Sequence, residues 1–441
     1  MAEQIKSNKI MNRWIVVIGA VLVQLALGTI YCWGNVTTYL TSYIRITEPN
    51  ILYKDTIYIF AIGLMLFAIT MIFSGQLQQK IGPMKVGIIG GIFVSLGIIL
   101  SSFIKTFVGF LMTYGALFGI GIGFAYVCPI ACAAKWFPDK KGMINGIAVA
   151  GFGAGAFIFN KITTYFVNPE NLKATILGAD GKYYFDPTSS VVAKVPSLLI
   201  LLGVVYAIMV IGGSLVLKNP PAGWLPKGWT PPTPIKVEDG KKLKIDYNRN
   251  EIIKMPQFWM IWCMFILTAA AGLFTIGNYK NFGKANNPLI TDQFLSDIGA
   301  WAALFNGLGR IVWGMLSDQI GYKKTMITMF LTQAIFMFTL ILTPANQYIF
   351  LIWVCMIYFC FGGNFSLYPT ATTDLFGAKY LGPNYGIVFT AYGIAGVAGA
   401  LLESAIGALI GFQGLFITMG ILSLFAIGIA IPLKQPIKKE E

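Results

Sequence analysis

The chain contains many stretches of apolar residues that are long enough to cross a lipid bilayer as α-helices. A spanning helix needs about 20 mainly apolar residues, because every backbone N–H and C=O group must be satisfied inside the segment. About a dozen such stretches are present, so the pattern predicts an all-α membrane protein with twelve transmembrane helices. We expect them near residues 14–40, 57–78, 84–104, 107–134, 143–167, 196–217, 257–279, 293–316, 324–343, 347–373, 384–410 and 412–433.

A polar stretch rich in proline and lysine separates the first six apolar stretches from the last six. Its composition is typical of a linker. We therefore expect an N-terminal six-helix bundle at 1–217, a cytoplasmic linker at 218–255 and a C-terminal six-helix bundle at 256–441. No small-residue cleavage site follows the first apolar stretch, which is expected to remain as a helix.

The positive charges indicate how the chain is oriented in the membrane. If the N-terminus is cytoplasmic, roughly 22 of the 32 lysines and arginines lie in cytoplasmic segments, which favours cytoplasmic termini and linker. The formal charge of +14 is spread over many short loops. A nucleic-acid partner is therefore not expected, and we predict a lipid-embedded monomer in the cell membrane.

The residue types present argue against an enzyme. There is no histidine, which excludes histidine-based catalytic dyads, metal sites and proton relays. The six cysteines lie in apolar stretches without metal-ligand spacing, and the glycine runs lie inside apolar helices without a preceding strand. We therefore expect a transporter without a metal or cofactor.

The two halves of the chain resemble each other. Residues 75–85 (G-Q-L-Q-Q-K-I-G-P-M-K) return as residues 314–324 (G-M-L-S-D-Q-I-G-Y-K-K). The same spacing relates Phe137 to Phe376 and Asn145 to Asn384. Duplicated six-helix halves predict a parallel-repeat transporter with its substrate site between the halves, near the membrane midplane.

The G-x-L-x-D-x-x-G-x-x-K pattern of residues 314–324 resembles the cytoplasmic loop signature of the major facilitator superfamily. Four further segments resemble its oxalate/formate antiporter branch, which is related to the monocarboxylate transporters: K-W-F-P-D-K-K-G at 135–142, M-P-Q-F-W at 255–259, N-G-L-G-R at 306–310 and D-L-F-G at 374–377. The resemblance implies the major facilitator fold and a small carboxylate held by a basic residue of the eighth helix, here Arg310. The first-half loop departs from the pattern, because Gln79 stands where the family usually has aspartate. This leaves the loop-to-helix charge contact open in that half.

Arg310 also stands out on physical grounds. An arginine inside a spanning helix costs several kcal/mol unless it faces a partner or a water-filled cavity. Its planar guanidinium can hold a carboxylate through two charge-assisted hydrogen bonds. The alternative is a side chain that reaches to the nearby cytoplasmic interface. Asn306 lies one helical turn before Arg310 and is placed to orient the guanidinium or to bind the substrate.

Other polar side chains within the spans complete the predicted substrate site, with interhelical packing as the alternative for each. They are Tyr31, Tyr126, Tyr392, Asn364 and Asn278.

The charge of the predicted site favours a monocarboxylate such as formate, lactate or pyruvate. The oxalate-exchanging members that the chain resembles carry a lysine in the eleventh helix, and Tyr392 stands at the matching position. A single cation neutralises a monoanion, whereas oxalate would keep an uncompensated charge in a low dielectric. Proton-using relatives carry an acid where this chain has Asn306, which favours anion exchange; proton-linked transport stays open as the alternative.

Three alternatives to monocarboxylate transport stay open at this point. They are exchange of oxalate for formate, transport of another small solute, and a membrane sensor that does not transport.

A few charged residues near the helix ends are candidates for gates. Lys161 and Asp297 are expected to form an outer salt bridge, and Glu403 to meet Lys54 or the first outer loop. Asp318 belongs to the loop signature. Solvated charges at helix ends are the alternative for the two outer pairs. The outer loop at about 168–196 is longer than the fold requires, and no role is predicted for it.

Overall fold

The computed structural model describes residues 11–179, 183–221, 223–230, 246–287, 289–290 and 292–436, without the side chains at 54, 281, 284, 292, 293, 296, 397 and 399–408. Before the linker the elements are α1 (Arg13–Leu27), η1 (Gly28–Cys32), α2 (Trp33–Ile44), α3 (Tyr53–Ile81), α4 (Pro83–Ser101), α5 (Phe107–Phe110), η2 (Leu111–Leu117), α6 (Phe118–Trp136), α7 (Lys141–Val167), β1 (Ile176–Leu177), β2 (Tyr183–Tyr184), α8 (Ser190–Ala193) and α9 (Val195–Leu215). After it come α10 (Arg249–Ile252), α11 (Pro256–Asn286), α12 (Asp292–Ile320), α13 (Tyr322–Leu340), α14 (Gln347–Phe376), α15 (Leu381–Val388) and α16 (Thr390–Ala430).

These helices make twelve crossings of the bundle within the described residues, as predicted. The first six are α1 to α2, α3, α4, α5 to α6, α7 and α9, and the last six begin with α11, α12, α13 and α14. The eleventh runs from α15 into α16 and ends at Gly411, whose φ of 63° interrupts α16 before the twelfth. By length and composition, nine helices of the described chain are apolar enough to span a membrane.

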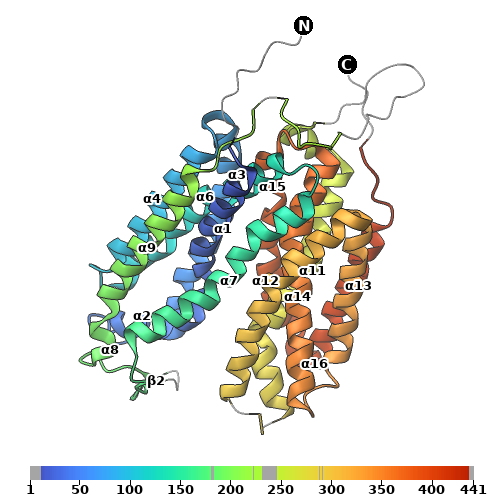
Figure 1. Ribbon diagram of the computed structural model, residues 1–441. Coiled ribbons are helices and arrows are strands. Elements are labelled where there is room, and N and C mark those ends of the chain that lie inside the picture. Colours follow the sequence, from blue (N-terminus) through green and yellow to red (C-terminus); the bar gives the residue numbers. More distant parts are fainter. Residues whose placement is uncertain are drawn as a thin grey trace, which may run out of the picture.

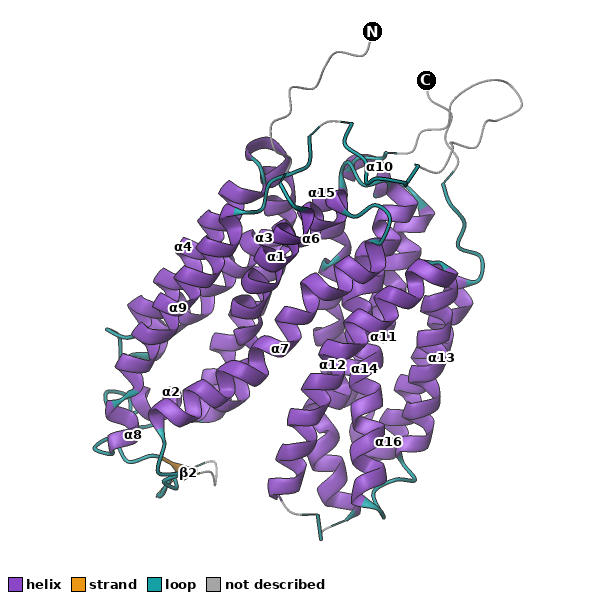
Figure 2. Cartoon of the chain, in the orientation of Figure 1, coloured by secondary structure: helices purple, strands orange, loops and turns teal. Residues whose placement is uncertain are grey.

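The helices form two groups that lie side by side, α1 to α9 in one and α11 to α16 in the other (Figure 1). Helices make up almost all of the regular structure, and the loops gather at the two ends (Figure 2). The described chain begins before α1 and ends after α16 at the same end of the molecule, which we call the termini face. The opposite end carries β2, and we call it the hairpin face.

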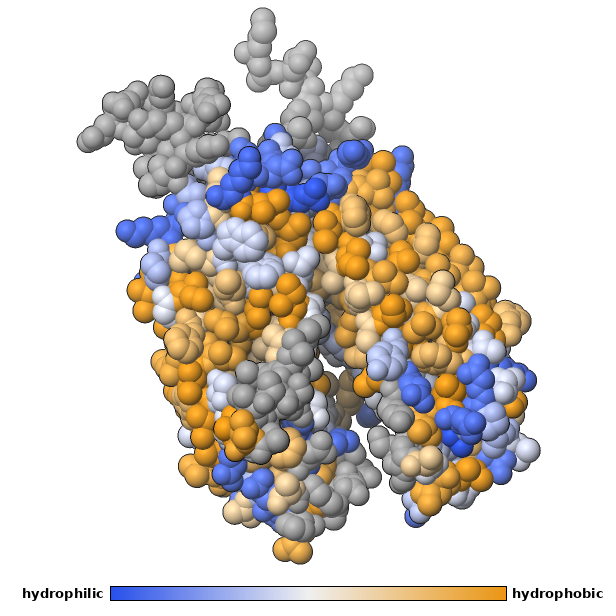
Figure 3. Space-filling view, turned by 180° about the vertical axis from the view of Figure 1, so that it is seen from behind, coloured by the Kyte–Doolittle hydropathy of each residue, from blue (hydrophilic) through white to orange (hydrophobic). Residues whose placement is uncertain are grey.

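The surface is that of a protein surrounded by lipid. Apolar residues cover the flanks of both groups of helices, and hydrophilic residues gather at the ends (Figure 3). Many large apolar side chains on the helices are exposed, for example Phe73, Met112 and Ile208. In water such a continuous apolar surface would be unfavourable, whereas lipid tails solvate it.

The two groups of helices touch at the termini face and part toward the hairpin face. A Cβ atom at Gly142 of α7 would collide with the backbone oxygen of Gly314 of α12, and one at Gly314 would collide with that of Gly142. Glycine is needed here because the two backbones pack directly on each other. Toward the hairpin face a gap separates the halves (Figure 3), so this conformation is open on that side.

The long loop after α7 is anchored on the hairpin face by an aromatic stack. β1 and β2 pair antiparallel, and the fully buried ring of Tyr184 stacks on Tyr53 with a centroid distance of 4.4 Å. The guanidinium of Arg45, the residue that follows α2, lies 4.3 Å from the Tyr184 ring centroid. The loop thus caps the ends of α2 and α3.

We expect Tyr184→Ala to lower the free energy of unfolding by about 3 kcal/mol, because it removes a buried aromatic ring from this stack. Tyr183→Ala is the matched control, because its side chain is 58% exposed; its effect should stay within about 0.5 kcal/mol. Denaturant or thermal unfolding of the detergent-purified protein measures both. Equal destabilisation by the two variants would contradict the anchoring role.

Candidate functional site

Arg310 lies at the contact between the two halves and is almost completely buried, with 1% of its surface exposed. Its Nε donates to Oδ1 of Asn306 at 3.1 Å, within α12. Its Nη1 donates to the backbone oxygen of Val149 on α7 at 2.7 Å. A Cβ atom at Gly146 would collide with the backbone oxygen of Arg310, so the glycine lets α7 approach closely. The arginine of one half is therefore bound to the backbone of the other.

Aromatic rings from both halves surround the guanidinium. Its Cζ lies 4.4 Å from the ring centroid of Phe365 on α14 and 5.8 Å from that of Phe152 on α7. Cation–π contacts of this kind stabilise a cation in a desolvated site. The ion pairs of the described residues join other side chains, so no carboxylate there neutralises Arg310. An uncompensated buried cation makes a strong site for an anion.

Four tyrosine side chains lie close enough to interact electrostatically with the guanidinium: Tyr31, Tyr126, Tyr385 and Tyr392. The hydroxyls of Tyr31 and Tyr392 are 2.7 Å apart and join the two halves. Tyr31 lies in η1, a 3₁₀ segment that interrupts the first crossing between α1 and α2. Such interruptions often occur at functional positions of a helix.

Phe389 fills the centre of the aromatic cluster, at the junction of α15 and α16. Its ring centroid lies 5.4 Å from that of Phe67 and 5.2 Å from that of Tyr126, both in the first half. It lies 5.3 Å from that of Tyr392 in the second half. The ring is 1% exposed and so belongs to the packed contact between the two halves.

The predicted substrate-binding residues fall into two groups. Asn306, Tyr31, Tyr126 and Tyr392 lie around Arg310, as described above. Asn364 is buried in the second half, where its Oδ1 accepts from Oγ1 of Thr268 at 3.0 Å. Asn278 donates to the backbone oxygen of Phe274 in its own helix, at 3.3 Å.

Asp318 links the two halves at the termini face. Its two carboxylate oxygens accept from the backbone N–H groups of Gly142 at 2.7 Å and Met143 at 2.8 Å, at the start of α7. A negative charge is stabilising there, because the helix dipole and the free N–H groups favour it. Lys141 and Asp374 add an ion pair of 2.9 Å across the same interface.

The first-half copy of this loop makes a weaker contact. Nε2 of Gln79 donates to the backbone oxygen of Lys379 at 2.8 Å, so a neutral hydrogen bond stands where the other half has a carboxylate at a helix start. The contact that Gln79 makes at the closed termini face is therefore weaker than the contact that Asp318 makes.

We expect Asp318→Asn to reduce transport about 10- to 30-fold, because loss of the charge at the start of α7 removes about 2 kcal/mol from the closed termini face. Rates of solute uptake into proteoliposomes would measure this. Asp186→Asn is the control, because Asp186 bonds within its own loop, to the backbone N–H and hydroxyl of Thr188. Full activity of Asp318→Asn would show that the carboxylate does not hold the face closed.

The other predicted gating residues lie at the open hairpin face. Nζ of Lys161 lies 4.5 Å above the ring of Phe157, and the Asp297 side chain is exposed. An ion pair between these two is not among those of the described residues. Because the halves are apart on this side, the outer salt bridge stays a prediction for the opposite conformation. The side chains of Glu403 and Lys54 lie outside the described part of the structure.

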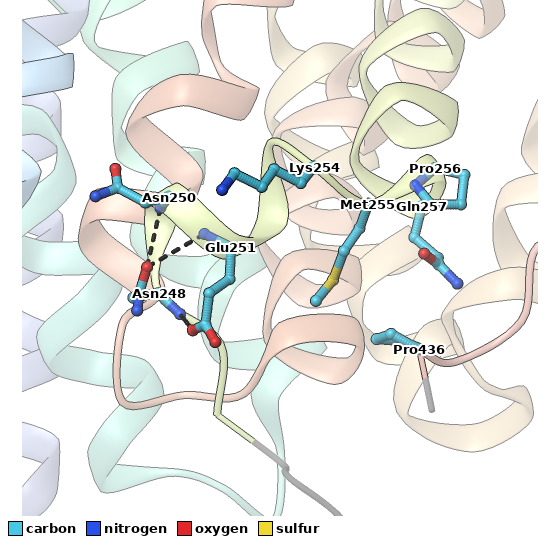
Figure 4. Close-up of a pocket in the computed structure, with 8 residues that line it drawn as sticks. All are labelled: Asn248, Asn250, Glu251, Lys254, Met255, Pro256, Gln257 and Pro436. Carbon is cyan, nitrogen blue, oxygen red and sulfur yellow. Dashed lines mark hydrogen bonds between the residues drawn. The ribbon is translucent and has the colours of Figure 1, made fainter. Parts of the chain in front are cut away.

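A separate cavity of about 600 Å³ lies at the termini face, where the end of the linker approaches the C-terminal tail (Figure 4). Oδ1 of Asn248 accepts from the backbone N–H groups of Asn250 and Glu251 beside it. The residues that line it do not include Arg310 or its neighbours. The lining residues are Asn248, Asn250, Glu251, Lys254, Met255, Pro256, Gln257 and Pro436.

Sequence reasoning missed the contribution of the fifth crossing to the site, and from the eleventh crossing it predicted only Tyr392. Phe152 and the Val149 carbonyl come from α7, Tyr385 from α15, and Phe389 from the junction after it. Aromatic residues in apolar spans carry no signal that separates them from packing residues. The close contact of α7 with α12, which the predicted pairing of Lys161 with Asp297 requires, is present in the structure.

Known proteins of several kinds are similar to this chain. It is 27% identical to the apicoplast pyruvate carrier 1 of Toxoplasma gondii, over 93% of this chain and 87% of that protein. It is 26% identical to the oxalate:formate antiporter of Oxalobacter formigenes, over 97% of this chain and 94% of that protein. Monocarboxylate transporter 12-B of Danio rerio is 25% identical, over 68% of this chain and 62% of that protein.

Solved structures show the same fold at low sequence identity. The proton:xylose symporter XylE matches with a TM-score of 0.67 and 14% identity, over 97% of this chain and 96% of that one. The E. coli fucose:proton symporter matches with a TM-score of 0.63 and 13% identity, over 94% of this chain and 97% of that one. The family model described as Major Facilitator Superfamily matches residues 25–282 and 279–441. The resemblance seen in the sequence motifs is confirmed, and the chain belongs to the major facilitator superfamily.

Proposed function

We propose that this protein carries small monocarboxylate anions across a membrane by alternating access, with the carboxylate bound at Arg310. The observation that carries the proposal is the buried guanidinium at the contact between the halves, which no carboxylate of the described residues neutralises. Similarity to a pyruvate carrier, an oxalate:formate antiporter and a monocarboxylate transporter supports the same class of solute.

The hydrogen bonds of Arg310 leave room for a carboxylate. An arginine has five N–H donors, and Asn306 and Val149 take one each. The remaining donors are enough for two parallel bonds to a carboxylate, which is the strongest arrangement for this pair. A monoanion then neutralises the site, whereas a dianion leaves one negative charge in a low dielectric.

The two halves are the moving parts in this proposal. Residues 1–217 and 256–441 rock against each other, and the linker at 218–255 lies in the cytoplasm with the termini face. Opening on that side breaks the bonds of Asp318 and the ion pair of Lys141 with Asp374. Closure of the hairpin face brings Lys161 and Asp297 together. We place the protein in the cell membrane.

Anion exchange fits the site better than proton-linked transport. The amide of Asn306 bonds Arg310 directly, and an amide cannot carry a proton across the membrane. Exchange of oxalate for formate is a second candidate, which the similarity to an antiporter of these anions favours. Tyr392 supplies a hydroxyl and no second positive charge, which disfavours oxalate.

Transport by the purified protein in liposomes tests the proposal. Uptake of radiolabelled formate, lactate, pyruvate and oxalate is followed with and without an internal anion, and with and without a pH gradient. We expect saturable monocarboxylate uptake that depends on an internal anion. Oxalate uptake at least as fast would favour the second candidate, and no carboxylate uptake by folded protein would contradict both.

A further inference from the structure

Two buried tyrosine hydroxyls beside Arg310 have no hydrogen-bond partner in the described structure. Tyr126 belongs to α6 in the first half and Tyr385 to α15 in the second, and both side chains are 0% exposed. The two hydroxyls lie close enough to interact with each other but outside hydrogen-bonding geometry, and both lie near the guanidinium. Each half therefore presents one unsatisfied donor at the same place.

These hydroxyls differ from the other tyrosine pair at the site. Tyr31 and Tyr392 satisfy each other with a hydrogen bond of 2.7 Å. An unpaired buried hydroxyl destabilises the protein that contains it, and phenylalanine would fill the same space without that penalty. A bound substrate that accepts hydrogen bonds from both hydroxyls would remove this penalty, which explains why tyrosine rather than phenylalanine stands at the two positions.

The rings that carry the hydroxyls are held in place by packing. The Tyr126 ring makes edge contacts with Phe67 at 5.2 Å and Phe152 at 5.1 Å between centroids. The Tyr385 ring makes an edge contact with Phe389 at 5.7 Å. Phe152 also lies beside the guanidinium, so the donors are fixed relative to Arg310. A pre-organised set of donors of this kind is suited to selecting among ligands.

The chemistry of the two donors indicates what they bind. This inference rests on the proposed function, in which the carboxylate takes the N–H groups of Arg310. The hydroxyls then need a neutral acceptor on the same molecule, and two neighbouring donors suit one carbonyl oxygen with its two lone pairs. In a short acid, the carbon beside the carboxylate is the position that brings such an oxygen near both groups.

We propose that Tyr126 and Tyr385 each donate to the 2-oxo oxygen of the substrate, so that the protein selects 2-oxo monocarboxylates over unsubstituted ones. A site built to hydrogen-bond a substrate oxygen disfavours an analogue that lacks it, because the donors stay unpaired. The preference requires both halves, so the bound 2-oxo acid also draws them together.

Pyruvate and propionate test this, because both are three-carbon monoanions and differ in the carbonyl at the second carbon. Binding to the purified protein is measured by calorimetry for wild type and for the double variant Tyr126→Phe/Tyr385→Phe. We expect wild type to bind pyruvate at least about tenfold more tightly than propionate. The double variant should reduce this ratio to about two or less, chiefly through weaker pyruvate binding.

Tyr368→Phe is the matched control. Tyr368 is also buried in the aromatic cluster, stacked on Phe265, but its hydroxyl lies 3.3 Å from Oγ1 of Thr268. This variant should keep the wild-type ratio. The empty double variant should also melt at a higher temperature than wild type, because two unpaired hydroxyls are gone.

The outcomes separate this inference from the proposed function. Wild type without a preference, or a double variant with the full preference, would overturn the role of the two hydroxyls while leaving the Arg310 site intact. Binding of neither acid by folded wild type would overturn the proposed function, and this inference with it.

Discussion

Arg310→Gln is expected to reduce monocarboxylate uptake at least about 100-fold, because the variant loses the only positive charge that the described site offers to the anion. Gln keeps a polar group of similar reach but cannot hold a carboxylate through two charged donors. Arg310→Lys keeps the charge without the planar fork, so its uptake should fall less. Initial rates of radiolabelled pyruvate and formate uptake into proteoliposomes measure both variants.

Folding of the Arg310 variants can be checked independently. Removing a buried charge that has no carboxylate partner should raise the melting temperature of the empty protein, in the opposite direction to its effect on transport. Arg45→Gln provides the arginine control, since Arg45 lies at the hairpin face and contacts the Tyr184 ring. Wild-type uptake by Arg310→Gln would return the arginine to a purely structural role.

Gly314→Val is expected to reduce transport at least about 50-fold by preventing the termini face from closing. A side chain at Gly314 collides with the backbone of Gly142, and neither helix can yield without moving the whole half. The valine side chain should also separate Asp318 from the start of α7, which removes the hydrogen bonds that hold this face. Uptake rates measure the loss.

Whether the termini face fails to close can be measured separately from the loss of transport. Ser317 is buried beside this contact, so a Ser317→Cys reporter should react with maleimide faster in the Gly314→Val variant than alone. Gly212→Val is the glycine control, because a Cβ atom there meets nothing within 4 Å. Slow reporter labelling in an inactive Gly314→Val variant would mean that the face still closes.

The sequence predicted the twelve crossings and the central arginine for clear physical reasons. The cost of exposing backbone groups to lipid forces each crossing to be a long apolar helix, which is readable without a structure. Arg310 is conspicuous as a charge within such a helix, and Asn306 follows from helical periodicity. Asp318 was found because its loop resembles the signature of the family.

The remaining features depend on tertiary contacts that leave little trace in the sequence. Tyr385 and Phe389 are aromatic residues in an apolar span, and only the approach of α15 to α6 brings them beside Tyr126. Asn278 was predicted from its polarity alone, and in the structure its Nδ2 donates to the backbone oxygen of Phe274 in the same helix. The hairpin loop is anchored by the Tyr53 and Tyr184 stack between segments about 130 residues apart, which no local pattern predicts.

The guanidinium, which no carboxylate of the described residues neutralises, also sets the response to membrane voltage that we expect of the proposed carrier. With a monoanion bound, the site is neutral and its reorientation moves no net charge across the field. The empty site carries a positive charge, and reorienting it against the potential costs about 2.3 kcal/mol per 100 mV if it crosses the whole field. Exchange of one monoanion for another should therefore be electrically silent. Net movement of an anion in one direction requires the empty return step and should be electrogenic, with a rate that follows the membrane potential.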